Sequence, residues 1–364
     1  MPMTGIERMK AVLDRKPVDQ TPIAVSPWGA TVQRWREEGH IGAEEDVAEH
    51  FGQEIRSAGW LNSVADLDFE PVTIEETEET ILRLDGNGAT LRAHKLHDST
   101  PEHVDFRVRD RTQWEQFAKP LLVETDRRRV GFEGYRHVRQ YCAEKSLYFC
   151  WGGVGPFEQM HPISGHEHML MGMALDPEWV KDMADTYADL SVRHLDLLFS
   201  EEGAPDGFFV FEDLGFKQRP FMSPDMYAGI MQPAHERLFG FAHDHGCKVI
   251  VHSCGYVEPL VPGMIEAGMD CLQAMEVKAG MHMPSLFERF GDRIAFYGGV
   301  DVRCLIRNDR QEIDTEMDEK ILPVVQGGGG YVLHSDHSEP PEVDYETMMY
   351  FVQRGRTLGR NGAS

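Results

Sequence analysis

The chain contains a pair of metal-binding residue types at a spacing that allows both to hold one ion. His252 and Cys254 follow the β-branched run VIV at 249–251, which predicts a buried strand after Lys248. Alternate residues of a strand point to the same side, so the imidazole and the thiolate can converge on one ion. Gly255 then lets the chain turn away. Two ligands do not hold zinc, however, and a third must come from elsewhere in the chain.

A candidate for the third ligand is His337, which ends another predicted strand much later in the chain. Catalytic zinc sites use three N, S or O ligands and keep one position open for a reactant. His252, Cys254 and His337 would meet that requirement. His334 and Asp336 compete with His337, because spacing alone does not rank them. A zinc ion held there would lower the pKa of a bound thiol or hydroxyl group, or polarise an ether oxygen.

The elements that must position these residues alternate between strand and helix. Strands are expected at residues 147–151, 207–211, 248–251, 271–275, 294–297 and 330–333, with helices at 177–199, 223–245, from 257, 284–290, 311–325 and from 345. This alternation indicates parallel βα units, and a further strand is expected at 23–25. We therefore predict an α/β fold of the (β/α)8 TIM-barrel type. An open doubly wound sheet stays an alternative, because no Gly-x-Gly-x-x-Gly turn decides between the two.

In a barrel the active site lies at the carboxyl ends of the strands. At those ends the sequence places polar or ionisable side chains, namely Trp151, Glu212 with Asp213, His252 with Cys254, Glu276, Asp301 and the segment from His334 to His337. Glu212, Asp213 and Glu276 are the candidate catalytic acids, and Glu212 or Glu276 could also serve as a displaceable fourth zinc ligand. Asp213 and Asp301 have a competing interpretation as helix N-caps.

Three more residues are candidates for substrate binding: Trp28, Trp151 and Asp301. Core packing is the competing interpretation for both tryptophans. His161, His166 and His168 are expected on a loop that leads to a helix, as surface or pocket-rim residues.

Further helices and a β-hairpin are expected in the N-terminal part of the chain, before the regular βα units. Thr4 with Glu7 forms a predicted capping box for a helix at 4–13, and helices are also expected at 28–38, 44–52, 112–121 and 125–145. Alternating residues at 72–96 around the turn DGNG predict a β-hairpin. We expect a single domain over 1–364, with the additions in 1–146, βα units in 147–354 and a tail at 355–364.

The amino-acid composition limits the classes of binding partner that this protein can have. With 36 basic and 61 acidic residues the net charge is −25, which disfavours nucleic acid and anionic lipid as partners. The six cysteines show no paired spacing, and neither a signal peptide nor an apolar run of transmembrane length is found. These features predict a reduced cytoplasmic protein.

Several stretches resemble the uroporphyrinogen decarboxylase (URO-D) superfamily. They are ERMKAVLDRKPVDQTPI at 7–23, FEDLG at 211–215, SPDMY at 223–227, KVIVHSCG at 248–255, LVPGMIEAGMD at 260–270, EVKAGM at 276–281, FGDRIAFYGGVDV at 290–302 and SDHSEPP at 335–341. The resemblance covers most of the chain from about residue 147. It implies a (β/α)8 barrel, in agreement with the alternation of elements.

The motifs also separate two branches of that superfamily. The decarboxylases carry an Arg-x-Ala-Gly-Arg segment that binds substrate carboxylates, whereas the corresponding stretch here, SPWGATVQR at 26–34, lacks it. The zinc- and corrinoid-dependent methyltransferases share His-x-Cys and take a distal Cys as third ligand. Here His337, ahead of Pro340 and Pro341, stands in that place. The resemblance therefore implies zinc on His252, Cys254 and His337, with a more Lewis-acidic metal that favours an oxygen or nitrogen substrate.

We thus expect a methyltransferase that moves a methyl group between a small methylated substrate and a corrinoid protein. No Asp-x-His-x-x-Gly motif occurs in the chain, so the cobalamin is expected on a partner. A decarboxylase of tetrapyrrole biosynthesis and a non-catalytic metal-binding module are the alternatives. The sequence leaves the direction of transfer and the oligomeric state open, a homodimer among the options.

Overall fold

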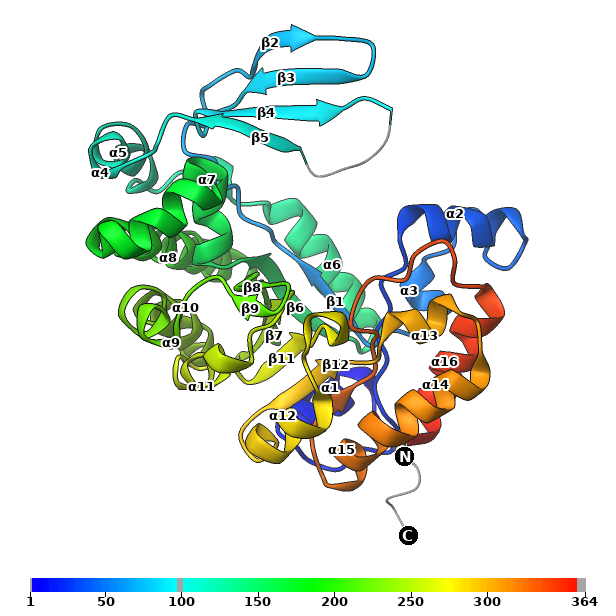
Figure 1. Ribbon diagram of the computed structural model, residues 1–364. Coiled ribbons are helices and arrows are strands. Elements are labelled where there is room, and N and C mark those ends of the chain that lie inside the picture. The colour runs from blue at the N-terminus through cyan, green and yellow to red at the C-terminus, as the bar shows by residue number, and fades with distance from the viewer. Residues whose placement is uncertain (1, 97–100, 359–364) are drawn as a thin grey trace.

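A curled parallel sheet forms the centre of the molecule. The structure is a computed structural model that describes residues 2–96 and 101–358. The sheet has seven strands in the order β1 (Ile55–Ala58), β6 (Tyr148–Val154), β7 (Gly207–Phe211), β10 (Lys248–Ser253), β11 (Cys271–Ala274), β12 (Ala295–Gly298) and β13 (Tyr331–Val332). All six pairings between neighbours are parallel. The prediction of an α/β fold built on parallel strands is confirmed (Figure 1).

The segment around Ile23 closes this sheet into a ring. Ile23 forms a parallel bridge with Leu333, directly after β13. On its other side the Ile23 carbonyl accepts a hydrogen bond of 3.2 Å from the N–H of Glu54, directly before β1. The strand expected at 23–25 is therefore reduced to one bridge. The strand β1, by contrast, was not predicted, because its sequence IRSA has neither an apolar run nor a clean alternation.

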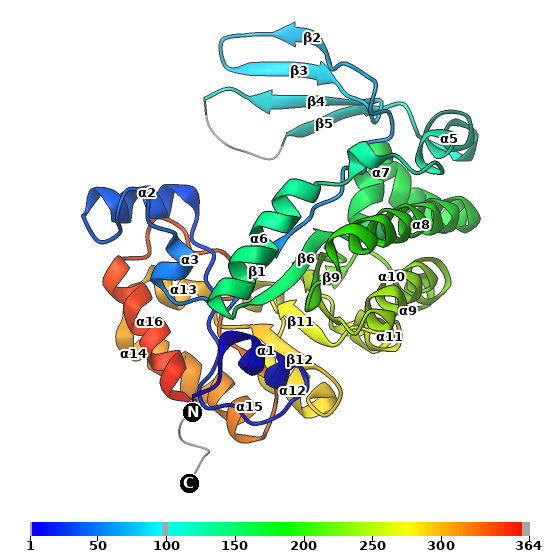
Figure 2. The ribbon, with the colours of Figure 1, turned by 180° about the vertical axis from the view of Figure 1, so that it is seen from behind.

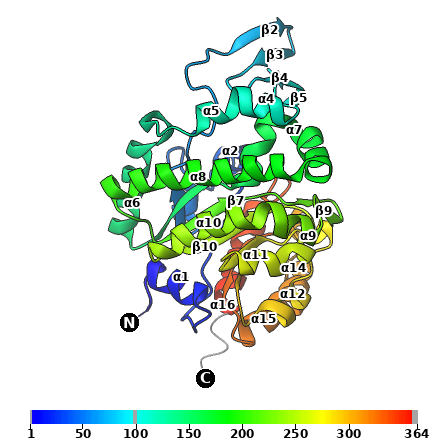
Figure 3. The same cartoon turned by 90° about the vertical axis from the view of Figure 1, so that its left-hand side faces the viewer.

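Helices surround the sheet on the outside. They are α7 (Pro156–Leu175), α8 (Pro177–Glu202), α9 (Pro224–Met226), η3 (Tyr227–Met231), α10 (Gln232–Asp244), η4 (Glu258–Leu260), α11 (Val261–Glu266), η5 (Val277–Ala279), α12 (Met283–Phe290), α13 (Val302–Ile306), α14 (Arg310–Glu316), η6 (Met317–Ile321), α15 (Leu322–Gln326) and α16 (Tyr345–Leu358). Figure 3 shows α8 and α10 side by side over one flank of the barrel. Because α16 runs to Leu358, residues 355–358 of the expected tail are helical. The remainder of that tail, 359–364, lies outside the described residues.

The N-terminal helix α1 (Gly5–Leu13) lies at the amino-terminal end of the barrel (Figure 2). Its predicted capping box is present, with Thr4 Oγ1 accepting from the N–H of Glu7 and the Glu7 side chain accepting from the N–H of Thr4. The apolar side chains of Met9, Val12 and Leu13 pack against inward-facing residues of the strands. This helix therefore fills the end of the barrel that is opposite to the expected active site.

A four-stranded antiparallel sheet stands apart from the barrel (Figure 1). Its strands are β2 (Val72–Glu76), β3 (Thr80–Leu84), β4 (Ala89–His94) and β5 (Glu102–Phe106), and β3 pairs with β4 across the turn at 85–88. The hairpin region of the sequence thus belongs to a larger sheet. We call this element the satellite sheet; its strands β4 and β5 pack against α7.

The remaining elements are short, apart from the helix at 132–145. They are α2 (Gly29–Glu37), α3 (Val47–His50), α4 (Arg111–Gln113), η1 (Trp114–Ala118), α5 (Lys119–Leu122), η2 (Arg127–Arg129) and α6 (Phe132–Lys145), with a small pair formed by β8 (Gly215–Phe216) and β9 (Arg219–Pro220) after β7. Within residues 2–96 and 101–358, no helix combines the length and the apolar character needed to cross a membrane.

One expectation about the histidines is wrong. His161, His166 and His168 were expected on a loop, but all three lie inside α7. The sequence hid this helix because Pro162 and Gly165 fall within it, and both residues normally mark the end of a helix. Gly165 does interrupt the helical backbone, with φ 68° and ψ 157°, and the chain resumes a helix on the far side.

Candidate metal centre

Three side chains of metal-binding type meet at the carboxyl ends of two neighbouring strands. They are Asp213 after β7, His252 on β10 and Cys254 after β10, and one ligand atom of each lies within 4.8 Å of the other two. His252 Nε2 is 3.4 Å from Cys254 Sγ and 3.4 Å from Asp213 Oδ1. The register of the sheet explains this meeting, because Phe211 pairs with His252 and so places the residues that follow β7 beside His252. We call these three residues the mouth cluster.

The backbone and a neighbouring amide hold the mouth cluster in place. Gln273 of β11 pairs in register with His252, and its side-chain oxygen accepts a hydrogen bond from His252 Nδ1–H. This bond leaves Nε2 as the unprotonated, metal-binding nitrogen. Asp213 Oδ1 accepts from the N–H of Cys254 at 2.7 Å. Each ligand is therefore oriented by a contact of its own.

The turn after Cys254 requires glycine. Gly255 has φ 74°, and a Cβ there would lie 2.5 Å from the carbonyl carbon of Gly215. Its N–H donates to Glu276 Oε2 at 2.9 Å. Glu276 thus fixes the backbone that carries Cys254, which is a positioning role.

The donor set of the mouth cluster fits a zinc ion. Imidazole nitrogen, thiolate sulfur and carboxylate oxygen are the ligand types of catalytic zinc sites. Burial, followed by the nearby carboxylates of Asp213, Glu276 and Glu158, raises the pKa of the Cys254 thiol to about 12. The three carboxylates disfavour the ionised form of the thiol, and a bound divalent cation would offset this effect.

A cavity of about 490 Å³ opens over the mouth cluster. Its lining consists of Val25, Ser26, Gln53, Ile55, Arg56, Ser57, Phe209, Phe211, His252, Cys254, Gln273, Ala274, Tyr297, His334, Asp336, His337 and Ser338. Aromatic rings form one wall, and Arg56 is the only Lys or Arg among these described lining residues. The cavity suits a small, largely apolar substrate with one polar group.

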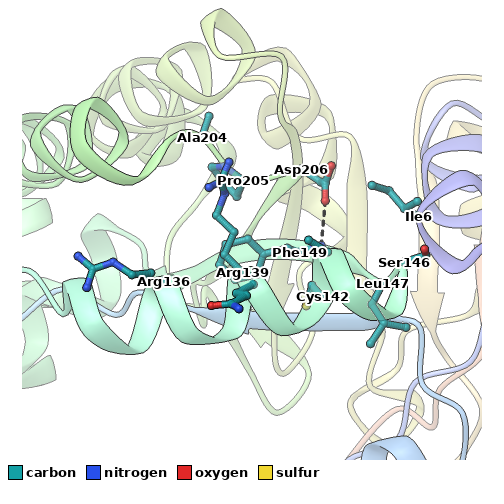
Figure 4. A pocket seen from close by; sticks show the side chains of 12 residues that line it. Ile6, Arg136, Arg139, Cys142, Ser146, Leu147, Phe149, Ala204, Pro205 and Asp206 are labelled. Carbon is teal, nitrogen blue, oxygen red and sulfur yellow. Dashed lines mark hydrogen bonds between the residues drawn. The ribbon is translucent and has the colours of Figure 1, made fainter.

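A second cavity of similar size lies away from this chemistry. It measures about 540 Å³ and lies at the amino-terminal ends of β6 and β7, where Arg136 and Arg139 of α6 line it together with Asp206 (Figure 4). Asp206 accepts a hydrogen bond of 3.1 Å from the N–H of Phe149 and thereby joins the two strands. Barrel enzymes place their active sites at the opposite end of the strands, so the cavity over the mouth cluster is the candidate site.

The segment 334–337 lines this cavity but does not supply the third member of the cluster. His337 is exposed, and its Nδ1 accepts from the N–H of Ser338 at 3.0 Å. Asp336 accepts from the N–H groups of Val277 and Val302, each at 2.8 Å, and burial raises its pKa to about 6. His334 is buried with Nε2 2.8 Å from Ser26 Oγ. Among the described residues, the structure brings Asp213, rather than any of these three, to His252 and Cys254.

Glu212, a predicted catalytic acid, and Asp301, a predicted substrate-binding residue, have structural partners instead of a place in the cavity. Glu212 is fully buried, lies 2.6 Å from His235 Nε2 and accepts from the N–H groups of Phe157 and Glu158. It therefore anchors the first turn of α7. Asp301 caps α13 by accepting from the N–H of Arg303 at 2.9 Å, as its N-cap interpretation predicts. Asp213 is not a cap, because its carboxylate faces Cys254 and His252.

Neither tryptophan singled out in the sequence lines the cavity. Trp28 precedes α2 and is 48% exposed. Trp151 is buried in β6, where its Nε1–H donates to the carbonyl of Gly59 at 2.7 Å and its ring packs against Phe208. Trp151 is therefore a core residue, the competing interpretation for this side chain.

Sequence reasoning missed Gln273 and Arg56. Gln273 was detectable in principle, because a polar residue stands alone inside the apolar strand CLQAM at 271–275. Arg56 was not, because the strand that carries it gave no pattern.

Comparison with known proteins agrees with the fold. The family model of uroporphyrinogen decarboxylase (URO-D) matches residues 96–358. The chain therefore belongs to the URO-D family. A curated relative, the methylated-thiol–coenzyme M methyltransferase of Methanosarcina mazei, is 27% identical over 161 residues, which is 44% of this chain. The chain spans 40% of the length of that relative.

A solved structure supports the fold over nearly the whole chain. It is described as a methyltransferase from Methanosarcina mazei, and the match covers 98% of both chains with a TM-score of 0.64. At 17% sequence identity this likeness establishes the shared architecture only. The family match and the shared architecture thus place the chain within the URO-D family.

Proposed function

We propose that this protein is a zinc-dependent methyltransferase that moves a methyl group between a small methylated substrate and a corrinoid protein. The observation that carries the proposal is the convergence of Asp213, His252 and Cys254 at the carboxyl end of a barrel, under a cavity of about 490 Å³. Membership of the URO-D family and the name of the curated relative support the methyl-transfer chemistry.

The mouth cluster would hold the metal, with His252 and Cys254 as in the sequence prediction and Asp213 in the third place. His337, on the rim of the same cavity, would be an added donor only after a shift of its segment. A bound zinc ion supplies Lewis acidity to the heteroatom that gives up the methyl group. The carboxylate oxygen of Asp213 is a harder ligand than a second thiolate and donates less electron density to the metal, which favours oxygen or nitrogen substrates.

The protein's own residues bind and orient the substrate. Phe209, Phe211 and Tyr297 supply the apolar wall, which excludes water from the methyl group. Arg56 belongs to the lining but does not present a free charge to the substrate, because its guanidinium pairs with Asp46 and donates to the carbonyls of Gln53 and Ile55. The side chains of Ser26, Gln53 and Ser57 also line the cavity and can hydrogen-bond a polar end of the substrate. Of the three predicted acids, Asp213 acts at the metal, Glu276 positions the Cys254 turn and Glu212 anchors α7.

The corrinoid is a partner's group in this proposal. In the overall reaction the methyl carbon passes from the substrate's heteroatom to the reduced cobalt, and the heteroatom keeps the bonding electron pair. The reverse transfer uses the same residues. All six cysteines of the chain are unpaired, which favours a reducing compartment such as the cytoplasm for this reaction.

Metal analysis combined with a methyl-transfer assay tests the proposal. The chain is loaded with Zn²⁺ and mixed with chemically reduced cob(I)alamin and, in turn, a methyl ether, a methylamine and a methyl thioether. Formation of methylcobalamin, followed by absorbance, is expected for the wild type and is expected to fall at least ~10³-fold in Cys254→Ala. Zinc bound by the mouth cluster should be lost from the same variant.

Cys304→Ala is the matched control, because Cys304 is a buried cysteine that does not line the cavity. It should keep both metal and activity. Unchanged methyl transfer in Cys254→Ala would remove the proposal. If the protein releases CO2 from a porphyrinogen and chelators do not inhibit this reaction, it is a decarboxylase instead. If it binds zinc but transfers no methyl group, it is a metal-binding module.

A further inference from the structure

A second group of metal-binding side chains lies outside the cavity, where the satellite sheet meets the barrel. His103 of β5 and His161 and His166 of α7 each bring one ring nitrogen within 4.8 Å of the other two. The rings of His161 and His166 stack with their centroids 4.4 Å apart, and His103 stacks on His161 at 6.1 Å. We call these three residues the histidine cluster.

The break in α7 builds this cluster. Residues five apart lie on different faces of a regular helix, which turns once every 3.6 residues. The non-helical backbone at Gly165 lies between His161 and His166 and brings their rings together. A Cβ on Gly165 would lie 2.4 Å from the ring of Phe106, so glycine also lets β5, which carries His103, approach α7.

One nitrogen of the cluster lacks a partner. His161 Nε2 lies 3.1 Å from Glu158 Oε2 and is assigned as the N–H donor of that bond. Nδ1 of the same ring is then unprotonated, and it is buried without a hydrogen-bond partner. A carboxylate, a histidine and a free lone pair in this order form the arrangement that orients histidine ligands toward a metal.

Burial also disfavours the protonated form of two rings of the cluster. Burial, together with the neighbouring imidazoles of His161 and His103, lowers the pKa of His166 to about 4. Burial and the proximity of His161 likewise lower the pKa of His103.

We propose that His103, His161 and His166 form a second metal site, which takes a divalent transition-metal ion of the Zn²⁺ type. Three imidazole nitrogens match the ligand preference of zinc, whose Zn–N bonds run ~2.0–2.1 Å. Glu158 orients His161 through Nε2, and a water molecule or a further ligand completes the coordination. Because His103 belongs to β5 and the other two ligands to α7, the ion fastens the satellite sheet to the barrel.

Packing alone is the competing explanation. The ring of His166 also lies 5.4 Å from Phe221 and 6.4 Å from Phe157, so the cluster forms part of an aromatic layer. An aromatic layer needs no metal and predicts no bound ion. The two explanations therefore differ in a quantity that can be counted.

Counting zinc in the Cys254→Ala background tests the proposal, because the mouth cluster is disabled there. The full-length variant is stripped with a chelator, titrated with Zn²⁺ alone and analysed by plasma mass spectrometry. One zinc per chain is expected in Cys254→Ala and none after adding His161→Gln or His166→Gln. Adding His168→Gln is the matched control, since His168 lies on the same helix outside the cluster, and it should leave the one zinc in place.

Thermal unfolding gives a second readout that does not depend on stoichiometry. Zn²⁺ should raise the Tm of Cys254→Ala, and His161→Gln in that background should abolish the shift. Absence of zinc and of any Tm shift in Cys254→Ala would overturn the proposal. The failure of the proposed function is a different result: wild type and Cys254→Ala would then both bind one zinc, and His161→Gln would bind none.

Discussion

The two clusters are assembled by different means. The mouth cluster lies at the ends of β7 and β10, which are adjacent, hydrogen-bonded strands of one sheet. The histidine cluster joins an interrupted helix to a strand of a separate sheet. Sheet register places the first set of ligands whether or not an ion is bound, whereas the second set depends on the docking of two bodies. A metal can therefore add to the rigidity of the histidine cluster much more than to that of the mouth cluster.

The two clusters also differ in charge. Asp213 and Cys254 give the mouth cluster two anionic ligands when an ion is bound, and these balance the charge of Zn²⁺. The histidine cluster offers imidazoles only, so the ion there keeps its full charge and Glu158 is the adjacent carboxylate. The difference in charge therefore matches a difference in proposed role. The mouth cluster lies under a substrate cavity, whereas the histidine cluster joins two parts of the fold.

The largest effect is expected from the third ligand of the mouth cluster. Asp213→Asn removes the anionic oxygen and should weaken Zn²⁺ binding at the mouth at least ~100-fold, because catalytic zinc sites depend on three protein ligands. His337→Gln should weaken it less than ~3-fold, because the exposed His337 is not part of the cluster. Competition with a chromophoric chelator in the His161→Gln background measures the mouth affinity alone.

If His337→Gln weakened zinc binding more than Asp213→Asn, His337 would be the third ligand, as the sequence predicted. A loss of zinc in His337→Gln with little change in Asp213→Asn would mean that the segment 335–338 moves onto the metal. Asp213→Asn keeps the shape of the side chain, and circular dichroism of both variants checks that each remains folded.

Much of the barrel could be predicted from local patterns. The capping box of α1 is present as predicted, and β7 begins and ends at the predicted residues. Local patterns failed where tertiary contacts decide the structure. The polar strand β1 exists because it pairs with β6, and α7 continues past Gly165 because that glycine accommodates Phe106 of another element.

The candidate site divides in the same way. His252 and Cys254 could be paired from sequence, because alternation along one strand places them together. The choice between Asp213 and His337 could not be made, because it depends on the offset between strands. The pairing of Phe211 with His252 determines that offset, and no property of a single strand encodes it.

A smaller effect is expected from the residues that orient the ligands, and it should separate the two clusters. Gln273→Leu removes the acceptor of His252 Nδ1–H and should weaken zinc binding at the mouth about 10–100-fold while sparing the histidine cluster. Glu158→Gln should do the reverse, with a similar loss at the histidine cluster, because it changes the partner of His161 Nε2. The same chelator competition, in the His161→Gln and Cys254→Ala backgrounds respectively, gives the two affinities.

If either variant weakened zinc binding at the other cluster as well, the two clusters would not be independent. Glu158 tests this point most directly, because its carboxylate also contributes to the raised pKa of the Cys254 thiol. A loss at the mouth in Glu158→Gln as large as that at the histidine cluster would show that the two clusters are energetically coupled.

The smallest effect, about tenfold per pH unit, is a difference in the pH dependence of zinc affinity. Burial raises the pKa of the Cys254 thiol to about 12, so an ion at the mouth must displace a thiol proton at every pH from 7 to 9. Proton competition falls as pH rises, and zinc affinity there should increase about tenfold per pH unit. Lowered pKa values keep His103 and His166 neutral over the same range, so affinity at the histidine cluster should change less than about twofold. Chelator competition at three pH values, on His161→Gln and on Cys254→Ala, measures both slopes. Equal slopes would mean that the same acid–base group limits both sites, and the charge contrast between the clusters would not hold.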